Sequence, residues 1–220
     1  SASQGEPIYL RKESYLNGKR TDSKGWHHKY RRVGLQESCP QNNFRRIIAS
    51  MIPEGEFCNH KINYFPEHKS RIPLEALLAI LNSKLCDWYF RLGSTNAAVS
   101  HYQLYNLPVP VISEPAKEDE LSDDVEQALS ERQWSDLQRL LKPQLSSPPF
   151  PRSILTVLVR LTQEIVRCET ERGDITRTER SALAAEAQSC QDVIDDILYR
   201  TAGMTNQESA ALEQRLMGML

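Results

Sequence analysis

The sequence lacks the motifs by which most enzymes are recognised. It contains no Asn-Pro-Pro-aromatic motif, no Gly-x-Ser-x-Gly elbow and no Pro-Asp…Glu-x-Lys arrangement for magnesium-dependent nucleolysis. Its nine glycines are scattered singly, so no glycine-rich turn is present to hold a nucleotide or S-adenosylmethionine. We therefore expect no catalytic residue, no cofactor site and no metal site in this chain.

Long apolar runs and paired cysteines are missing as well. No apolar run approaches the roughly 18 residues that span a bilayer, and no signal-peptide pattern opens the chain, so we expect no membrane partner. Five cysteines without a Cys-x-x-Cys pair are typical of reduced thiols in the cytoplasm. Cys58-Asn-His60, with His27-His28 upstream, matches no usual zinc spacing. The chain has no initiating Met, and we expect it to be part of a longer protein.

Charge divides the chain into two halves. Residues 1–112 contain 15 Lys and Arg against 9 Asp and Glu, whereas residues 113–220 contain 12 against 20. All five histidines lie in the first half. This asymmetry indicates that only the first half meets a polyanion, although solvated helix faces and chance would give the same counts.

The first half has the pattern of a small sheet followed by a helix. The stretches 45–52 and 61–65 are β-prone and follow an aromatic and basic segment at 26–36, so we expect three to five strands with loops between them. From Pro73 onward, leucines at helical spacing predict one amphipathic helix that ends at Gly93.

The second half is predicted to be helical. An acidic helix is expected from Ser122 to about Leu141, followed by a proline-rich linker at 142–151. Apolar stripes and capping boxes, which open at Thr176 and Thr205, predict the remaining helices. The expected fold class is α+β, with a small mixed sheet, a packed amphipathic helix and a C-terminal helical hairpin. The expected segments are 1–112, an insert at 113–151, and a hairpin at 152–220 that packs on the first segment.

Three stretches of the chain, in a fixed order, carry a family signature. They are RRIIASMIPEG at 45–55 with FCNHKIN at 57–63, then LLAILNSKLCDWYFRL at 77–92 with STN at 94–96 and LPVP at 107–110, and finally IDDILYRTAGMTNQE at 194–208. Together they resemble the TaqI-like C-terminal specificity domain, which is the target-recognition domain of type IIG restriction–modification enzymes and adenine-specific DNA methyltransferases. The insert at 113–150 has no role under this resemblance.

The resemblance implies recognition of a specific double-stranded DNA sequence for an adenine-N6 methyltransferase domain. That domain would lie on the N-terminal side of the same parent chain and would bind S-adenosylmethionine. The target adenine has to leave the base stack, because its amino group cannot be reached inside the duplex. The expected partners are therefore double-stranded DNA and the methyltransferase domain. Whether the parent protein also carries an endonuclease stays open.

The candidate DNA-binding residues lie in the basic half. Phosphate contacts need Lys or Arg on loops and strand edges, and base edges are read by Arg, Asn and Gln. We expect most contacts within 19–46, with Arg31 and the amides of 41–43 first. The candidates are Lys19, Arg20, Lys24, Lys29, Arg31, Arg32, Gln41, Asn42, Asn43, Arg45, Arg46, Lys61 and Lys69. A plain solvated side chain is the alternative for each of them.

Several polar residues have a second interpretation. Asn82 and Asn96 match the signature, but they could equally cap or brace a loop. His27-His28 is expected at the surface or on a phosphate, and Asp195-Asp196 on a solvated helix face. Two other functions remain: a protein-interaction module in which the hairpin at 152–217 acts as a spacer, and a small enzyme with an unrecognised site.

Overall fold

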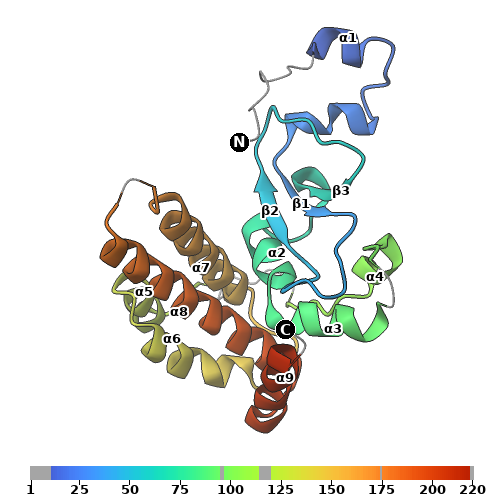
Figure 1. The fold of residues 1–220 in the computed structure, drawn as a ribbon. Coiled ribbons are helices and arrows are strands. Elements are labelled where there is room, and N and C mark those ends of the chain that lie inside the picture. The colour runs from blue at the N-terminus through green and yellow to red at the C-terminus, as the bar shows by residue number, and fades with distance from the viewer. Residues whose placement is uncertain (1–10, 95–96, 114–119, 174, 219–220) are drawn as a thin grey trace.

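A computed structural model of the chain describes residues 11–94, 97–113, 120–173 and 175–218. A three-stranded sheet lies in the first half of the chain, beside a group of longer helices from the second half (Figure 1). The strands are β1 (Arg32–Gln36), β2 (Ala49–Ile52) and β3 (Ile62–Pro66), in the order β2-β1-β3. The α+β class is confirmed. Both strand pairs are antiparallel, where a mixed sheet was expected.

Helices make up most of the rest of the described chain. The α-helices are α1 (Lys12–Leu16), α2 (Leu74–Leu81), α3 (Lys84–Gly93), α4 (His101–Tyr105), α5 (Asp123–Ser130), α6 (Trp134–Leu141), α7 (Ser153–Thr170), α8 (Arg177–Thr201) and α9 (Asn206–Gly218). The 3-10 helices are η1 (Lys24–Lys29), η2 (Glu67–Lys69) and η3 (Lys142–Leu145). None of the described helices combines the length and apolar composition that a bilayer span needs. Both expected capping boxes are confirmed, at Thr176 and at Thr205.

Helix α2 is the centre of the molecule. It lies between the sheet and the hairpin of α7 and α8 (Figure 1). A helix buried on nearly all sides belongs to the core, and six of its eight residues are buried: Leu74, Ala76, Leu78, Ala79, Ile80 and Leu81. Thr162 of α7 donates a hydrogen bond from its hydroxyl to the Glu75 carbonyl at 3.1 Å. The sheet segment and the C-terminal helices therefore share one core.

The single helix expected from Pro73 to Gly93 is wrong, because the chain breaks at Asn82 and Ser83. Ser83 is extended, with φ −76° and ψ 154°, and its hydroxyl accepts a hydrogen bond from the Cys86 amide and so caps α3. The Asn82 side chain binds both backbone groups of Ala49 in β2, at 2.9 and 3.0 Å. Asn82 therefore braces a strand. Asn96 lies outside the described residues.

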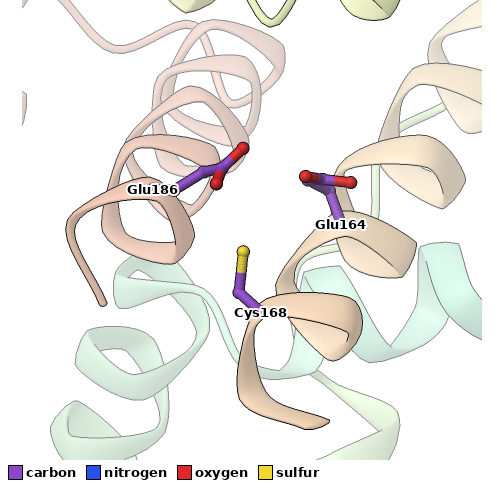
Figure 2. A group of neighbouring side chains, drawn as sticks. All are labelled: Glu164, Cys168 and Glu186. Atoms are coloured by element: carbon purple, nitrogen blue, oxygen red, sulfur yellow. The ribbon is translucent and has the colours of Figure 1, made fainter. Parts of the chain in front are cut away.

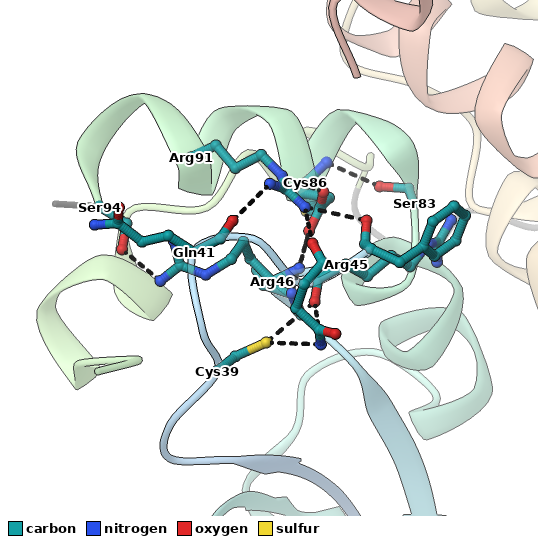
Figure 3. A network of polar contacts seen from close by, with 12 residues as sticks. Cys39, Gln41, Arg45, Arg46, Ser83, Cys86, Arg91 and Ser94 are labelled. Atoms are coloured by element: carbon teal, nitrogen blue, oxygen red, sulfur yellow. Dashed lines mark hydrogen bonds and ion pairs between the residues drawn. The ribbon is translucent and has the colours of Figure 1, made fainter. Parts of the chain in front are cut away.

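A polar network attaches the loop before β2 to α3 (Figure 3). The carboxylate of the buried residue Asp87 accepts hydrogen bonds from the Arg46 and Ile47 amides at 2.6 and 3.2 Å and from Arg91 Nε at 2.7 Å. The Arg91 guanidinium also donates to the carbonyls of Asn43 and Phe44, at 3.0 and 3.1 Å. The loop backbone is therefore turned inward and held in place.

Asp195 was expected on a solvated face, but it is 1% exposed. One oxygen of its carboxylate accepts a hydrogen bond from the Lys84 amide at 2.8 Å, and the other lies 3.7 Å from Lys84 Nζ. Asp196 does lie nearer the surface and pairs with Arg200 at 2.9 Å. Residues of the first and third signature stretches thus form hydrogen bonds with residues 82–87 of the second stretch. The signature residues that take part in these contacts have structural roles.

We predict that Asp195→Asn changes the pH dependence of stability. Burial raises the pKa of Asp195 from 3.8 to about 6. The native state therefore binds this proton more tightly than the unfolded state, and the stabilisation is present at about pH 4 and lost as the pH rises through about 6. Between pH 4 and pH 7, wild-type stability should fall by about 2 kcal/mol relative to the variant. Urea unfolding at both pH values measures this, and a constant difference would contradict it.

The insert also departs from expectation. In place of one helix from Ser122 to Leu141, the chain turns at Arg132, whose φ is +57°, and forms α5 and α6. The Arg132 side chain reaches α7 and α8, where it pairs with Glu164 at 3.0 Å and Glu186 at 3.2 Å. The expected linker contains η3 and two buried side chains, Leu145 and Phe150. Both parts of the insert therefore pack on the core.

Candidate nucleic-acid interface

The sheet divides the candidate DNA-binding residues between its two ends. Arg32 at the start of β1 pairs with Ile52 and Pro66, whereas Gln36 at its end pairs with Ile62. Residues just before β1 and just after β3 therefore lie at one end, and residues between β1 and β2 lie at the other. Most contacts were expected within the single stretch 19–46, which the sheet divides between its two ends.

The first end gathers four exposed lysines. Lys24 and Lys29 bound η1, Lys19 packs against Gly25 within it, and Lys69 closes η2. Within the ranges that the structure describes, none of these lysines forms an ion pair with a carboxylate. We call Lys19, Lys24, Lys29 and Lys69 the lysine end. Because their charges are not neutralised within those ranges, they are available to an anion.

Aromatic rings hold η1 against the sheet. His28 stacks on Phe57 with ring centroids 4.5 Å apart, and His27 contacts the ring of Tyr64 at 5.8 Å edge to face. His28 Nδ1 donates to the Gly25 carbonyl at 2.9 Å. The expectation that His27 and His28 lie at the surface is wrong, since they are 8% and 2% exposed. The aromatic composition of 26–36 was the signal for this packing.

Two lysines of this end lie over rings. Lys29 Nζ is 4.5 Å from the centre of Trp26, and Lys19 Nζ is 4.7 Å from the centre of Tyr15. A cation over a ring face is attracted by the ring quadrupole, and this attraction restricts the conformational freedom of a long side chain. The ammonium groups are therefore partly preorganised.

Burial and nearby positive charges act together on His27. Burial lowers the pKa of His27 first, and the nearby cations Lys69 and Lys24 lower the pKa further, as do His68 and Arg32. Both lysines are exposed members of the lysine end. Lys69 and Lys24 therefore lie close enough to His27 to act on its pKa.

Three arginines near this end are less available than expected. Arg31 pairs with Glu67 and with Glu75 at 2.6 Å, and these hydrogen bonds raise its pKa. Arg32 is 2% exposed and donates to the Glu56 carbonyl at 2.6 Å. Arg20 is exposed and pairs with Asp22. Arg31 and Arg32 were among the residues expected on DNA, and the structure gives both of them structural partners.

The second end holds the remaining candidates, most of them engaged. Asn43 donates to Cys39 Sγ and the Arg45 carbonyl. Arg45 donates to the Asn82 carbonyl, and Arg46 is 2% exposed, with one guanidinium nitrogen 2.9 Å from Ser94 Oγ. Lys61 pairs with Glu37 at 3.3 Å. Of the expected base-reading amides, Gln41 and Asn42 are exposed.

One cluster has the composition of a metal site. Among the described residues, three potential ligand atoms converge at Glu164, Cys168 and Glu186, where they lie within 4.8 Å of one another (Figure 2). Arg132 and Arg167 each pair with both carboxylates, and Arg167 lowers the pKa of Glu164. Burial raises the pKa of the Cys168 thiol. Two guanidinium groups already balance the two carboxylates, so we assign the cluster to helix packing.

No family model, curated protein or solved structure matches this chain. Two features of the chain itself bear on its function. They are the exposed lysines at one end of the sheet and the signature stretches that meet at the start of α3.

Proposed function

We propose that this chain is the DNA target-recognition part of an adenine-specific DNA methyltransferase or type IIG restriction–modification enzyme. The observation that carries the proposal is the lysine end, where four exposed cations surround η1. Such a surface binds phosphates at any sequence and sets the register of a protein on the duplex. The protein acts in the cytoplasm, and its five free cysteines agree with a reducing compartment.

The signature residues support the same proposal through their structural roles. Asn82 and Ser83 fix the angle between α2 and α3, and Asp195 caps α3 from the C-terminal hairpin. A domain that reads DNA needs its reading loops on a rigid frame. The exposed amides Gln41 and Asn42, which are suited to adenine, extend from a loop that this frame holds.

The experiment that tests the proposal is selection from a library of DNA duplexes with a randomised central segment. The full chain, at low salt, should enrich one short sequence, and Gln41→Ala with Asn42→Ala should relax the preference at one or two positions while leaving phosphate-driven affinity largely intact. Enrichment of no sequence by a chain that still binds duplex DNA would leave only non-specific binding and overturn target recognition.

The catalytic partner in this proposal is a methyltransferase domain of the same parent chain, and S-adenosylmethionine belongs to that domain. We predict that the chain alone gives no heat of binding when titrated with S-adenosylmethionine and transfers no methyl group to DNA. The physical reason is that none of its turns has the glycine spacing that a nucleotide needs. Micromolar binding of the methyl donor by the chain alone would contradict this prediction.

A protein-interaction module is the second candidate function. Leu92 and Tyr102, on α3 and α4, are 60% and 79% exposed, and protein interfaces are enriched in aromatic residues such as Tyr102. A chain of this kind would bind a restriction–modification subunit without reading DNA. Duplex binding at low salt that depends on the lysine end separates the two functions, because an interaction module has no need of it.

A further inference from the structure

Among the described residues, β2 is an edge strand of the sheet, because the strand order β2-β1-β3 places no further strand beyond it. On the β3 side of β1, Glu67 N donates to Arg31 O and Glu37 N donates to Lys61 O. The backbone N–H and C=O groups of the odd-numbered residues of β1 therefore point toward β3. The backbone groups of its even-numbered residues consequently point toward β2. In an antiparallel pair these hydrogen bonds alternate along the strand. Ser50 therefore bonds to β1, and the backbone groups of its neighbours point outward.

At one outward-facing position of this edge, a side chain takes the place of a neighbouring strand. The Asn82 amide accepts a hydrogen bond from Ala49 N at 2.9 Å and donates one to Ala49 O at 3.0 Å. A residue of a neighbouring strand would supply the same donor and acceptor pair. The next outward position belongs to Met51. Nothing in the described part of the chain hydrogen-bonds to its N–H or its C=O.

A groove lies between this edge and the C-terminal hairpin. Its volume is about 440 Å³, and it is lined by β2, by the end of α2 and by one face of α7 and α8. Leu78, Ile165 and Ile194 supply apolar surface, and Val166 is 49% exposed at the rim. The charged side chain of the lining, Glu169, is paired with Arg172 at 2.8 Å. We call this the β2 groove.

We propose that the β2 groove binds an extended peptide segment of another protein, which adds to the sheet beside β2. The peptide backbone would pair with the N–H and C=O of Met51, and an apolar side chain would enter the groove over Leu78 and Ile165. Strand addition of this kind takes its affinity from main-chain hydrogen bonds and its specificity from pockets for alternate side chains. The open pair of backbone groups selects a polypeptide, and the lack of unpaired cations in the lining disfavours a nucleic acid.

The probe for this proposal is a heptapeptide phage library selected against the full chain. Enriched peptides, synthesised and titrated, should have apolar residues at alternate positions and should shift the amide resonance of Met51 and those of Val166 and Thr170. N-methylation of the one peptide residue that faces Met51 should weaken binding by at least about tenfold, whereas N-methylation of its neighbours should not.

Variants of the rim keep the test independent of folding. Val166→Glu and Thr170→Arg alter exposed side chains and should each weaken peptide binding by about tenfold or more. Val109→Glu is the matched control, since Val109 is 51% exposed and lies outside the groove. Failure to enrich any peptide, enrichment of peptides that bind Val166→Glu normally, or displacement of the peptide by duplex DNA would each overturn the proposal.

Discussion

Replacing the four residues of the lysine end with glutamine should flatten the salt dependence of DNA binding. Each phosphate that a lysine neutralises releases condensed counterions, so the logarithm of affinity falls with the logarithm of salt by roughly 0.9 per contact. If all four lysines contact phosphates, the slope should decrease by up to about 3.6, and each single replacement should decrease it by about 0.9. Fluorescence anisotropy with a labelled duplex, from low to moderate salt, measures the slope.

The matched control changes net charge by the same amount elsewhere on the molecule. It replaces four other exposed cations with glutamine: Lys142, Arg177, Arg180 and Arg215. This control should leave the slope nearly unchanged, because these residues lie in the acidic half. Equal effects of the two sets would mean that net charge alone governs binding. A larger effect of the control would mean that DNA binds to the acidic half of the chain.

Local patterns were sufficient to predict much of the fold. Capping boxes at Thr176 and Thr205 depend on residues three apart, so they are visible in the sequence and both are present. The helix breaks at Asn82 and Arg132 were not predicted. Each depends on a distant partner: Asn82 binds Ala49, and Arg132 reaches α7 and α8. Continuous helical spacing cannot reveal a side chain that finds its partner in another element.

The same limit applies to the candidate interface. The sequence identified the cations of the first half but could not tell which of them have carboxylate partners. Arg31 meets Glu67 and Glu75, which lie 36 and 44 residues away, and Arg32 is buried under the loop that follows β2. Only the fold shows which cations have partners, and therefore only the fold distinguishes the exposed lysines of the lysine end from these arginines.

Asp87→Ala should be among the most destabilising single changes in this chain. The Asp87 and Arg91 side chains are 4% and 8% exposed, so the substitution leaves a buried guanidinium without a counter-charge. It also leaves the amides of Arg46 and Ile47 without their acceptor. Removing one partner of a buried ion pair costs about 3–5 kcal/mol. Urea unfolding at neutral pH should show a decrease in the free energy of unfolding of this size.

The exposed ion pair of Asp136 and Arg139 provides a control for the buried pair of Asp87 and Arg91. Asp136→Ala removes a partner of Arg139 at 3.0 Å, but these side chains are 52% and 73% exposed, so water replaces the lost contact and stability should change little. Asp87→Ala combined with Arg91→Met removes the orphaned charge and should recover part of the loss. If Asp87→Ala were no more destabilising than Asp136→Ala, the network that holds the loop before β2 would not contribute to stability. The exposed amides Gln41 and Asn42 would then lack the rigid support that target recognition needs.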